Sequence, residues 1–501
     1  MIFSFLLSPN LAFSGKEVDT YQLAITSRPV TFDPSKVTDT SSGTIIIQLF
    51  DPLFVRNYDG SITEALIEHY DISESRNVYT FYLKKEIFFH NGDPITSYDV
   101  LGSLKDKIMF SRNEQQLNVV KGVADFQKGK RNYISGIKVV SEKIFSIELN
   151  NPFPHFIEML SDMSYSIKPK NYEQLEKRGL IVGSGPYRFV EQLGDEVHLQ
   201  KFNLYWKKDR IVNNIIFRVV KDYNQASDLI GKGLLDNSHP FVLKSPPGLG
   251  WKGYSYMHAC VRFFGFNTNA NYPFQNLKVR EALLSVLPIN EYHLKLTSNK
   301  KIPISRLVPP GLPGYIPKNW LAPMAFDDAV KVIRATKWGH KFKVYNHMLD
   351  DEEFVKVIKD ICKQWQKLGV PCEYEEVTLA QYVKLLHGGK LEVFVGKLMP
   401  HVPDTYWVLA TLHSGSMNNS TGTNSPTIDS LLDLSLNTED PAKRVVYFEK
   451  INDEIYRRMV IIPLKYMGYQ TYYVRNIFIL PPIDVTGPFF MRLNKISVKG
   501  I

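Results

Sequence analysis

The chain has 501 residues, of which 44% are hydrophobic and 22% charged, a composition that excludes disordered and fibrous proteins. Its length is several times that of a typical domain, so two or three domains are expected. The net charge of +9 arises from 60 basic and 51 acidic residues scattered along the sequence; this diffuse excess favours anionic partners only mildly and is not the clustered pattern of a nucleic-acid-binding protein.

The chain begins with an apolar segment. Residues 1–13 read MIFSFLLSPNLAF, well short of the roughly 20 residues that a transmembrane helix needs. Ala12-Phe13-Ser14 has the small-x-small form of a signal-peptidase site, although the usual positively charged start is missing. We expect a secretory signal peptide over residues 1–14, with its true start lost; an ordinary buried segment is the alternative. No cysteine lies near the expected cleavage point, which argues against a lipid anchor.

Two segments in the first third predict β-structure. Residues 79–83 (YTFYL) form a short β-rich run. Residues 139–149 (VVSEKIFSIEL) alternate apolar and polar side chains around a central Ser-Glu-Lys turn, as a hairpin does.

A polar cluster lies between these strands, at residues 88–100 (FFHNGDPITSYDV). It could be a catalytic cluster, a metal site or a turn. Asn91-Gly92 is typical of a tight turn, Asp93-Pro94 extends it, and residues 96–99 (TSYD) have the form of a capping box that opens a helix. Turn and cap chemistry accounts for every polar residue except His90, so we interpret the segment as a turn leading into a helix.

The second half of the chain alternates strands with helices. Loops are expected at residues 245–250 (SPPGLG) and 308–314 (VPPGLPG). Between them and the C-terminus we expect strand 341–345, helix 352–368, strand 372–377, helix 379–386 and strand 391–395, and Asp440-Pro441 marks the start of a later helix. Such alternation predicts βαβ units and an α/β sheet.

Three cysteines, Cys260, Cys362 and Cys372, are too few for a disulfide scaffold, and none belongs to a CxxC pair. A structural zinc site and a thioredoxin-like centre are therefore disfavoured. Cys362 ends a helical pattern and Cys372 opens the next strand, so these two could form a disulfide in an oxidising compartment.

The common catalytic and cofactor motifs are missing from the sequence. It contains no GxGxxG behind a strand, no P-loop, no HExxH and no GxSxG. His401 and His413 are separated by a run without other metal ligands. We therefore predict no catalytic residue, no metal site and no cofactor.

A series of motifs in a fixed order resembles one family. It comprises FFHNGDPITSYDV, Thr31-Phe32-Asp33-Pro34, residues 53–60 (LFVRNYDG), residues 184–187 (SGPY), residues 266–268 (FNT) with 279–283 (VREAL), and Pro463-Leu464 with Tyr466. These are similar to signatures of the family 5 solute-binding proteins of ABC transporters, the oligopeptide-, dipeptide- and nickel-binding group. The resemblance covers nearly the whole chain from about residue 20.

The resemblance implies an α/β, periplasmic-binding-protein-like (type II) fold with two lobes and an additional α+β domain. By the order of motifs, lobe I comprises residues 15–50, 182–262 and 478–501, the additional domain residues 51–181, and lobe III residues 263–477. The crossovers near 263 and 477 would be the hinge. Such a receptor closes on its ligand by a shift of population and performs no chemistry of its own.

The resemblance also implies where a peptide would bind. In peptide-binding members the ligand main chain adds as a strand between the "LDP"-like segment and a lobe III segment of the type GW-x-x-D-x-x-DP, similar here to residues 396–407 (GKLMPHVPDTYW). The expected ligand contacts are Arg28, Val30, Thr31, Lys397, Met399, His401, Asp404 and Trp407. For each of them, a plain loop or core role is the alternative.

One departure from the motif affects the expected ligand. Pro400 stands where peptide binders place the aspartate that pairs with the ligand's amino group. Asp404 is a substitute if the loop is shifted, while Lys397 and Arg28 suit an acidic or blocked terminus, as in a modified peptide or a cell-wall fragment.

The expected function is therefore that of a soluble, monomeric periplasmic receptor that delivers a peptide or peptide-like solute to an ABC transporter permease and binds no nucleic acid. A metal chelate, a sugar or a cell-wall fragment is the alternative ligand. A hydrolase or a sensor domain on the same fold is the alternative class. A regulator would need a DNA-binding helix-turn-helix, for which the residues before Tyr21 are too few.

Overall fold

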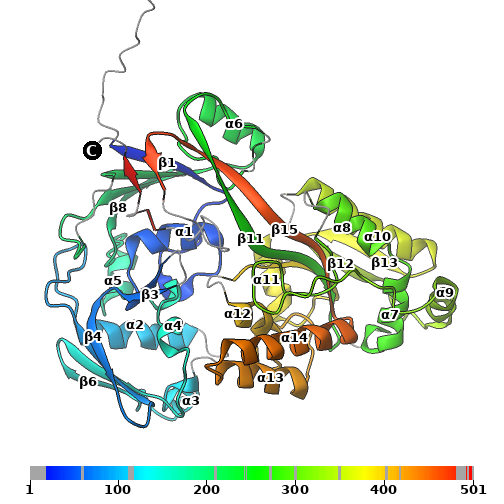
Figure 1. Cartoon of the computed structure of the whole chain (residues 1–501), viewed down its shortest axis with the longest axis horizontal. Helices are drawn as coiled ribbons and strands as arrows, with labels where there is room; N and C mark the ends of the chain where they lie inside the picture. The colour runs from blue at the N-terminus through cyan, green and yellow to red at the C-terminus, as the bar shows by residue number, and fades with distance from the viewer. Residues whose placement is uncertain are drawn as a thin grey trace, which may run out of the picture.

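The computed structural model describes residues 19–57, 61–110, 118–207, 212–241, 243, 245–269, 273–297, 302–347, 351–400, 404–416, 419–480, 492–493 and 496–498. The expected signal peptide and His401 lie outside these residues. The molecule has three units, each containing one sheet of four or five strands (Figure 1). We call them the N-terminal unit, the inserted unit and the C-terminal unit.

The N-terminal unit contains a four-stranded sheet in the order β1-β10-β9-β8, in which β1 and β10 are parallel. Tyr21, Ile45, Tyr187 and Phe217 belong to its core. The elements are β1 (Thr20–Ile25), α1 (Thr40–Leu49), β8 (Tyr187–Leu193), β9 (Glu196–Lys201), β10 (Asn214–Val219), α6 (Tyr223–Gly231), β16 (Phe478–Ile479) and β17 (Ser497–Val498).

The inserted unit contains an antiparallel sheet in the order β4-β5-β7-β6. The predicted strand at 79–83 and the predicted hairpin at 139–149 are both confirmed, as β5 and as β6 with β7. The elements are β2 (Phe54–Arg56), β3 (Ile62–Glu64), β4 (Ile67–Ile72), β5 (Val78–Leu83), α2 (Ser97–Phe110), α3 (Val123–Gln127), β6 (Ile137–Ser141), β7 (Ile144–Glu148), α4 (Phe156–Met159) and α5 (Tyr172–Lys177).

The polar segment 88–100 is a turn that leads into α2, as predicted. Gly92 has a φ of 88°, which favours glycine, and the side chain of Asp99 accepts hydrogen bonds from the N–H and the hydroxyl of Thr96. His90 has a structural role too: its Nδ1 accepts from the N–H of Gly183 at 3.0 Å, and its Nε2 donates to the carbonyl of Gly185 at 3.1 Å. The imidazole thereby joins the inserted unit to the N-terminal unit.

The C-terminal unit contains a five-stranded sheet in the order β13-β12-β14-β11-β15. Strands β13, β12 and β14 are parallel and alternate with helices, which confirms the predicted βαβ units. The elements are β11 (Trp251–Phe266), α7 (Leu277–Ser285), α8 (Ile289–Leu296), α9 (Phe326–Ala335), β12 (Phe342–Asn346), α10 (Glu352–Lys367), β13 (Cys372–Glu376), α11 (Leu379–His387), β14 (Val393–Leu398), α12 (Thr405–Leu409), α13 (Pro426–Leu436), α14 (Pro441–Arg458) and β15 (Ile461–Arg475).

Side chains on the two faces of this sheet belong to different cores. Val393 and Val395 of β14 pack with Trp365 of α10, whereas Phe394 packs in the core that contains Phe448 of α14. Asp440 caps α14 at its first turn, as predicted from Asp440-Pro441. Cys362 and Cys372 form a disulfide between α10 and β13.

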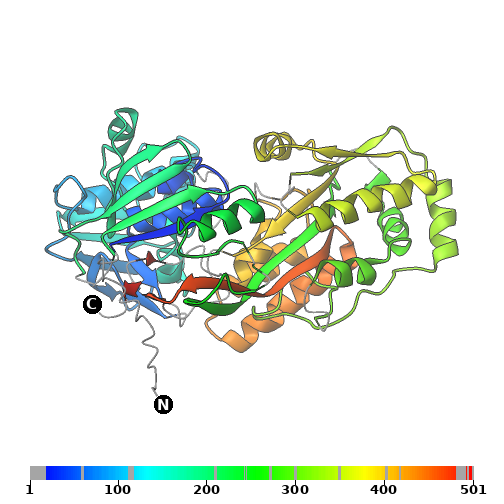
Figure 2. The ribbon, with the colours of Figure 1, turned by 90° about the horizontal axis from the view of Figure 1, so that it is seen from above.

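Two long strands join the N-terminal and C-terminal units (Figure 2). Strands β11 and β15 pair antiparallel from Trp251 opposite Arg475 to Gly265 opposite Ile461. Their register shifts between His258 and Val261, where the side chains pass from the core of one unit to that of the other. We call residues 254–262 of β11 and 465–473 of β15 the crossing region.

The inserted unit also touches the C-terminal unit. Arg76 forms an ion pair with Glu439 at 2.8 Å, and the ring of His155 lies 3.4 Å from the carbonyl oxygen of Thr438. Leu436 packs against buried cores of both units. The C-terminal unit is thus held on two sides, by continuous strands and by side-chain contacts.

Candidate ligand-binding site

Aromatic rings gather in the crossing region. Tyr472 stacks on Tyr254 with ring centroids 5.8 Å apart, and it meets His239 and Tyr256 edge-on. The ring of His258 lies 5.6 Å from that of Tyr256. This aromatic floor comes from β11, β15 and the segment 237–240, which is bonded to β15 through Ser238.

Both histidines of the floor are neutral at physiological pH. Burial, followed by the charges of Lys397 and Arg262, lowers the pKa of His258 to about 3. Burial also lowers the pKa of His239 well below its usual value. The floor therefore contributes neutral imidazole rings rather than positive charges.

A pocket lies beside the floor in the N-terminal unit. The described residues that line it carry no charge. They come from β1 and the residue after it, the first turns of α1, the segment around the His239-Pro240 bond and the C-terminal region: Leu23, Ala24, Ile25, Thr26, Thr40, Ser41, Thr44, Asn237, His239, Pro240 and Leu493. At about 20 Å³ the pocket has room for a water-sized group, which its hydroxyls and imidazole can hydrogen-bond.

The predicted wall in the N-terminal unit follows directly after this pocket. Ser42 of α1 accepts hydrogen bonds from the N–H groups of Val30 at 2.8 Å and of Thr31 at 3.2 Å, and Ser41 accepts from that of Ser27 at 3.3 Å. The side chain of Val30 is 73% exposed. Arg28 is exposed as well and pairs with Asp195 at 2.8 Å.

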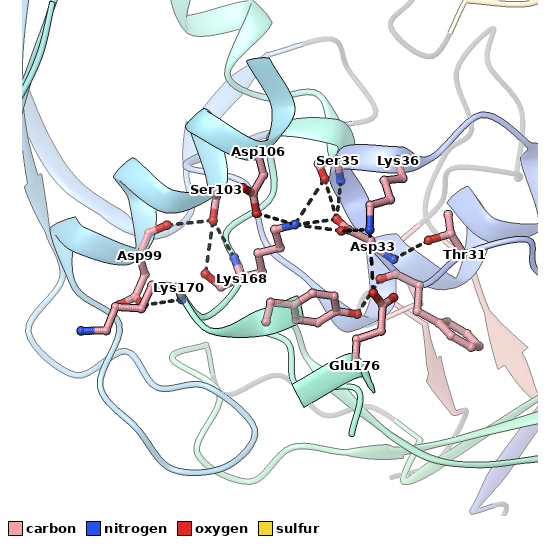
Figure 3. Close-up of polar contacts among 12 residues, drawn as sticks. Thr31, Asp33, Ser35, Lys36, Asp99, Ser103, Asp106, Lys168, Lys170 and Glu176 are labelled. Carbon is pink, nitrogen blue, oxygen red and sulfur yellow. Dashed lines mark hydrogen bonds and ion pairs between the residues drawn. The ribbon is translucent and has the colours of Figure 1, made fainter. Parts of the chain in front are cut away.

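A buried ion cluster fixes the far end of this wall (Figure 3). The ammonium of Lys168 lies 2.8 Å from Oδ1 of Asp33 and 3.0 Å from Oδ2 of Asp106, while the hydroxyl oxygen of Thr31 accepts from the N–H of Asp33. Burial alone would raise the pKa of Asp33, but Lys168 and the bonds from Ser35 lower it below its usual range. The carboxylate thus stays charged and holds the wall against the inserted unit.

The predicted wall in the C-terminal unit divides into two places. Met399 reaches the floor, with its sulfur 3.1 Å from Nε2 of His258. Lys397 is exposed and lies on β14, which ends at the residue before Met399. Asp404 and Trp407 instead line a second pocket, which faces Phe153 and Met159 of the inserted unit.

Asp404 has protein partners for its carboxylate. It caps α12 by accepting from the N–H of Tyr406, and it pairs with both terminal nitrogens of Arg444 at 2.7 and 3.2 Å. The carboxylate is largely buried. Bidentate pairing of this kind satisfies a carboxylate without a ligand.

The sequence predictions did not include the residues of the aromatic floor. His239, Tyr256, His258 and Tyr472 were not among the predicted residues. A histidine inside the apolar run that becomes β11 was the only available signal for His258, and it is equally typical of a core residue. No group of three or more histidine, cysteine, aspartate or glutamate side chains in the described part of the chain is arranged to bind a metal.

Among the described residues, no helix has both the length and the apolar character of a membrane span.

Comparison with known proteins matches residues 61–420 to the model of the bacterial extracellular solute-binding proteins, family 5 Middle. The chain is 26% identical over 484 residues to the oligopeptide-binding protein OppA of Bacillus subtilis, with 90% of this chain and 88% of that protein covered.

Solved structures share the fold over nearly all of the chain. The murein tripeptide binding protein MppA of Escherichia coli gives a TM-score of 0.82 at 19% identity, covering 96% of this chain and 99% of that one. OppA of Haemophilus influenzae, in complex with RPPGFSPFR, gives a TM-score of 0.79 at 18% identity, covering 96% of this chain and 99% of that one. The predicted two-lobed α/β fold is thereby confirmed.

Proposed function

The chain belongs to the bacterial extracellular solute-binding proteins of family 5, and we propose that it captures a peptide or peptide-like solute between two lobes for delivery to an ABC transporter permease. The observation that carries this proposal is the similarity to an oligopeptide-binding protein over 90% of the chain. Members of the family are binding proteins rather than enzymes. We extend this to the present chain as a receptor without catalytic activity.

The proposed lobes follow the divisions expected from the motifs. Lobe I is the N-terminal unit, lobe III is the C-terminal unit, and the inserted unit is the additional domain. The separate buried cores of the units support this division. The crossing region supports a hinge, because two paired strands with a shifted register run between the two lobes there.

The proposed ligand lies beside the aromatic floor, between the wall at residues 27–31 and the strand end at Lys397 and Met399. Tyr256, His258 and Tyr472 of the floor are buried and would support the site from beneath. The N–H groups of Val30 and Thr31 already donate to Ser42. A ligand strand added along this wall would therefore use its carbonyl oxygens or other N–H groups. Pro400 stands where peptide binders place the aspartate that pairs with the ligand's amino group. Arg444 already binds the carboxylate of Asp404, so we propose that this aspartate is lost rather than replaced by Asp404.

The proposed receptor works outside the cytoplasm, as the family description implies. We place it in the periplasm as a soluble monomer. It has no role in binding nucleic acid, because its basic residues are scattered through the sequence.

A thermal-shift panel tests the ligand class. Purified protein, freed of bound ligand by unfolding and refolding, is heated with pools of di- to pentapeptides, of sugars and of metal chelates. A ligand that binds only the folded state raises the melting temperature. Stabilisation by a peptide pool alone supports the proposal; stabilisation by sugars or chelates, with none by peptides, would refute it.

A further inference from the structure

Three cationic side chains form a row across neighbouring strands in the crossing region. Arg262 of β11 lies opposite Lys397 of β14 and opposite Lys465 of β15. Residues directly opposite each other in antiparallel strands point to the same face of the sheet. We call Arg262, Lys397 and Lys465 the basic row.

The members of the row differ in their partners. Arg262 and Lys465 both pair with Asp351, the residue that caps α10. Asp351 is only 17% exposed and stays ionised, because these two cations lower its pKa although burial would raise it. Lys397 is exposed and has no carboxylate partner among the described residues. It is therefore the member of the row that is available to a ligand.

Lys397 lies beside the aromatic floor. It is two residues before Met399, which directly follows β14 and whose sulfur contacts His258. The charges of Lys397 and Arg262 also act on His258, whose pKa they lower together with burial. The electrostatic potential at this edge of the floor is thus positive and disfavours a cationic ligand group.

We propose that Lys397 pairs with a carboxylate of the bound peptide and makes the receptor selective for peptides that carry one at this place. This inference rests on the proposed function. The carboxylate belongs either to the C-terminus of the peptide or to an acidic side chain, and either would form a charge-assisted hydrogen bond with the ammonium. Once the lobes close over the ligand and shield this pair from water, it should contribute more to affinity than it would on an open surface.

Matched peptides separate the two sources of the carboxylate. Dissociation constants are measured by calorimetry for Ala-Glu-Ala against Ala-Gln-Ala, and for Ala-Ala-Ala against its C-terminal amide. In the wild type, the peptide that lacks the recognised carboxylate should have a dissociation constant about 10-fold or more higher than its partner peptide. In Lys397→Met, the two dissociation constants should differ by less than about 3-fold. Lys397→Arg should keep the discrimination, because it keeps the charge.

Lys390→Met is the matched control. Lys390 is also exposed and precedes the opposite end of β14, so its loss should leave the discrimination unchanged. Equal affinity of the wild type for both members of each pair would overturn the inference while leaving peptide binding intact. Discrimination that persists in Lys397→Met would overturn it too. Binding of no peptide would overturn the proposed function, and this inference with it.

Discussion

Lys168 is a buried cation that joins the inserted unit to the ligand wall. Its side chain is 3% exposed, and its ammonium contacts Asp33, Asp106 and the hydroxyl of Ser35. Taking such charges out of water is costly, and their mutual pairing offsets the cost only while every partner is present. The cluster is therefore sensitive to the loss of a single member.

Replacement of Lys168 by methionine should lower the free energy of unfolding by about 3–5 kcal/mol, because Asp33 is left buried without its main counter-charge. Urea denaturation measures the change. Lys177→Met is the control, since Lys177 forms an exposed pair with Glu173 and its loss should leave the free energy of unfolding close to that of the wild type. Equal losses in the two variants would contradict this account.

The lowered pKa of Asp33 predicts acid sensitivity. A carboxyl group with a folded pKa below its unfolded value of about 3.9 stabilises the protein above that pH, and this stabilisation is lost as the pH falls toward the folded pKa. The free energy of unfolding of the wild type should therefore fall more steeply between about pH 5 and pH 3 than that of Asp33→Asn. Urea midpoints that fall equally with pH in the wild type and in Asp33→Asn would contradict this role of Asp33.

The sequence predicted Asp33 but not its partners. Asp33 belongs to a recognisable motif, whereas Lys168 is 135 residues away and lies in no pattern that marks a buried cation. Similarly, the expected ligand role of Asp404 came from its place in a motif, and only the folded chain brings Arg444 to it. Pairs formed across units depend on packing, which a single sequence does not report.

Helix α1 positions the ligand wall through its first turn. Asp39 caps the helix by accepting from the N–H of Ser42, and the hydroxyl of Ser42 in turn accepts from two N–H groups of the wall. A rigid helix thereby fixes the backbone of a segment that has no regular structure of its own.

Replacement of Ser42 by alanine should weaken peptide binding about 5- to 10-fold, because two N–H groups of the wall lose their acceptor and the wall loses its fixed position. Calorimetric titration gives the affinity. Ser435→Ala is the control: Ser435 is equally buried, but its hydroxyl donates within α13, away from the wall. The role assigned to Ser42 fails if both variants bind peptide with wild-type affinity.

Elements with a local signal were predicted closely, and elements set by tertiary structure were not. Helix α10 begins at the predicted residue and ends one residue early, because an apolar stripe and an N-cap define it. The 16-residue strand β11 was missed. The first part of β11 packs in the core of the N-terminal unit and the second part in a core of the C-terminal unit, so its apolar residues do not recur at a constant period.

At the scale of the molecule, the C-terminal unit contacts the others through the crossing region and through the loop after α13. The family resemblance predicted two lobes with a hinge, but not the contacts of Arg76 and His155 with this loop. These contacts close the molecule on the side away from the long strands. By stabilising the closed state, these contacts should raise its population and so increase the affinity for ligand.

Replacement of Glu439 by arginine should weaken peptide binding about 2- to 5-fold, because it places like charges at an exposed contact between the units. The double variant Arg76→Glu/Glu439→Arg restores opposite charges and should recover most of the affinity. Melting temperatures of all variants should stay close to that of the wild type, since both side chains are more than half exposed. Failure of the double variant to recover affinity would argue against a role in closure.

Hydrogen–deuterium exchange with and without a bound peptide tests the central claim most directly, because it reports where the ligand orders the backbone. Peptide binding should slow exchange together in residues 26–31, in the crossing region and in residues 396–400, while the far end of the inserted unit at residues 137–148 is unchanged. Saturating peptide that slows exchange in only one of the two lobes, or only outside these segments, would contradict capture between the lobes.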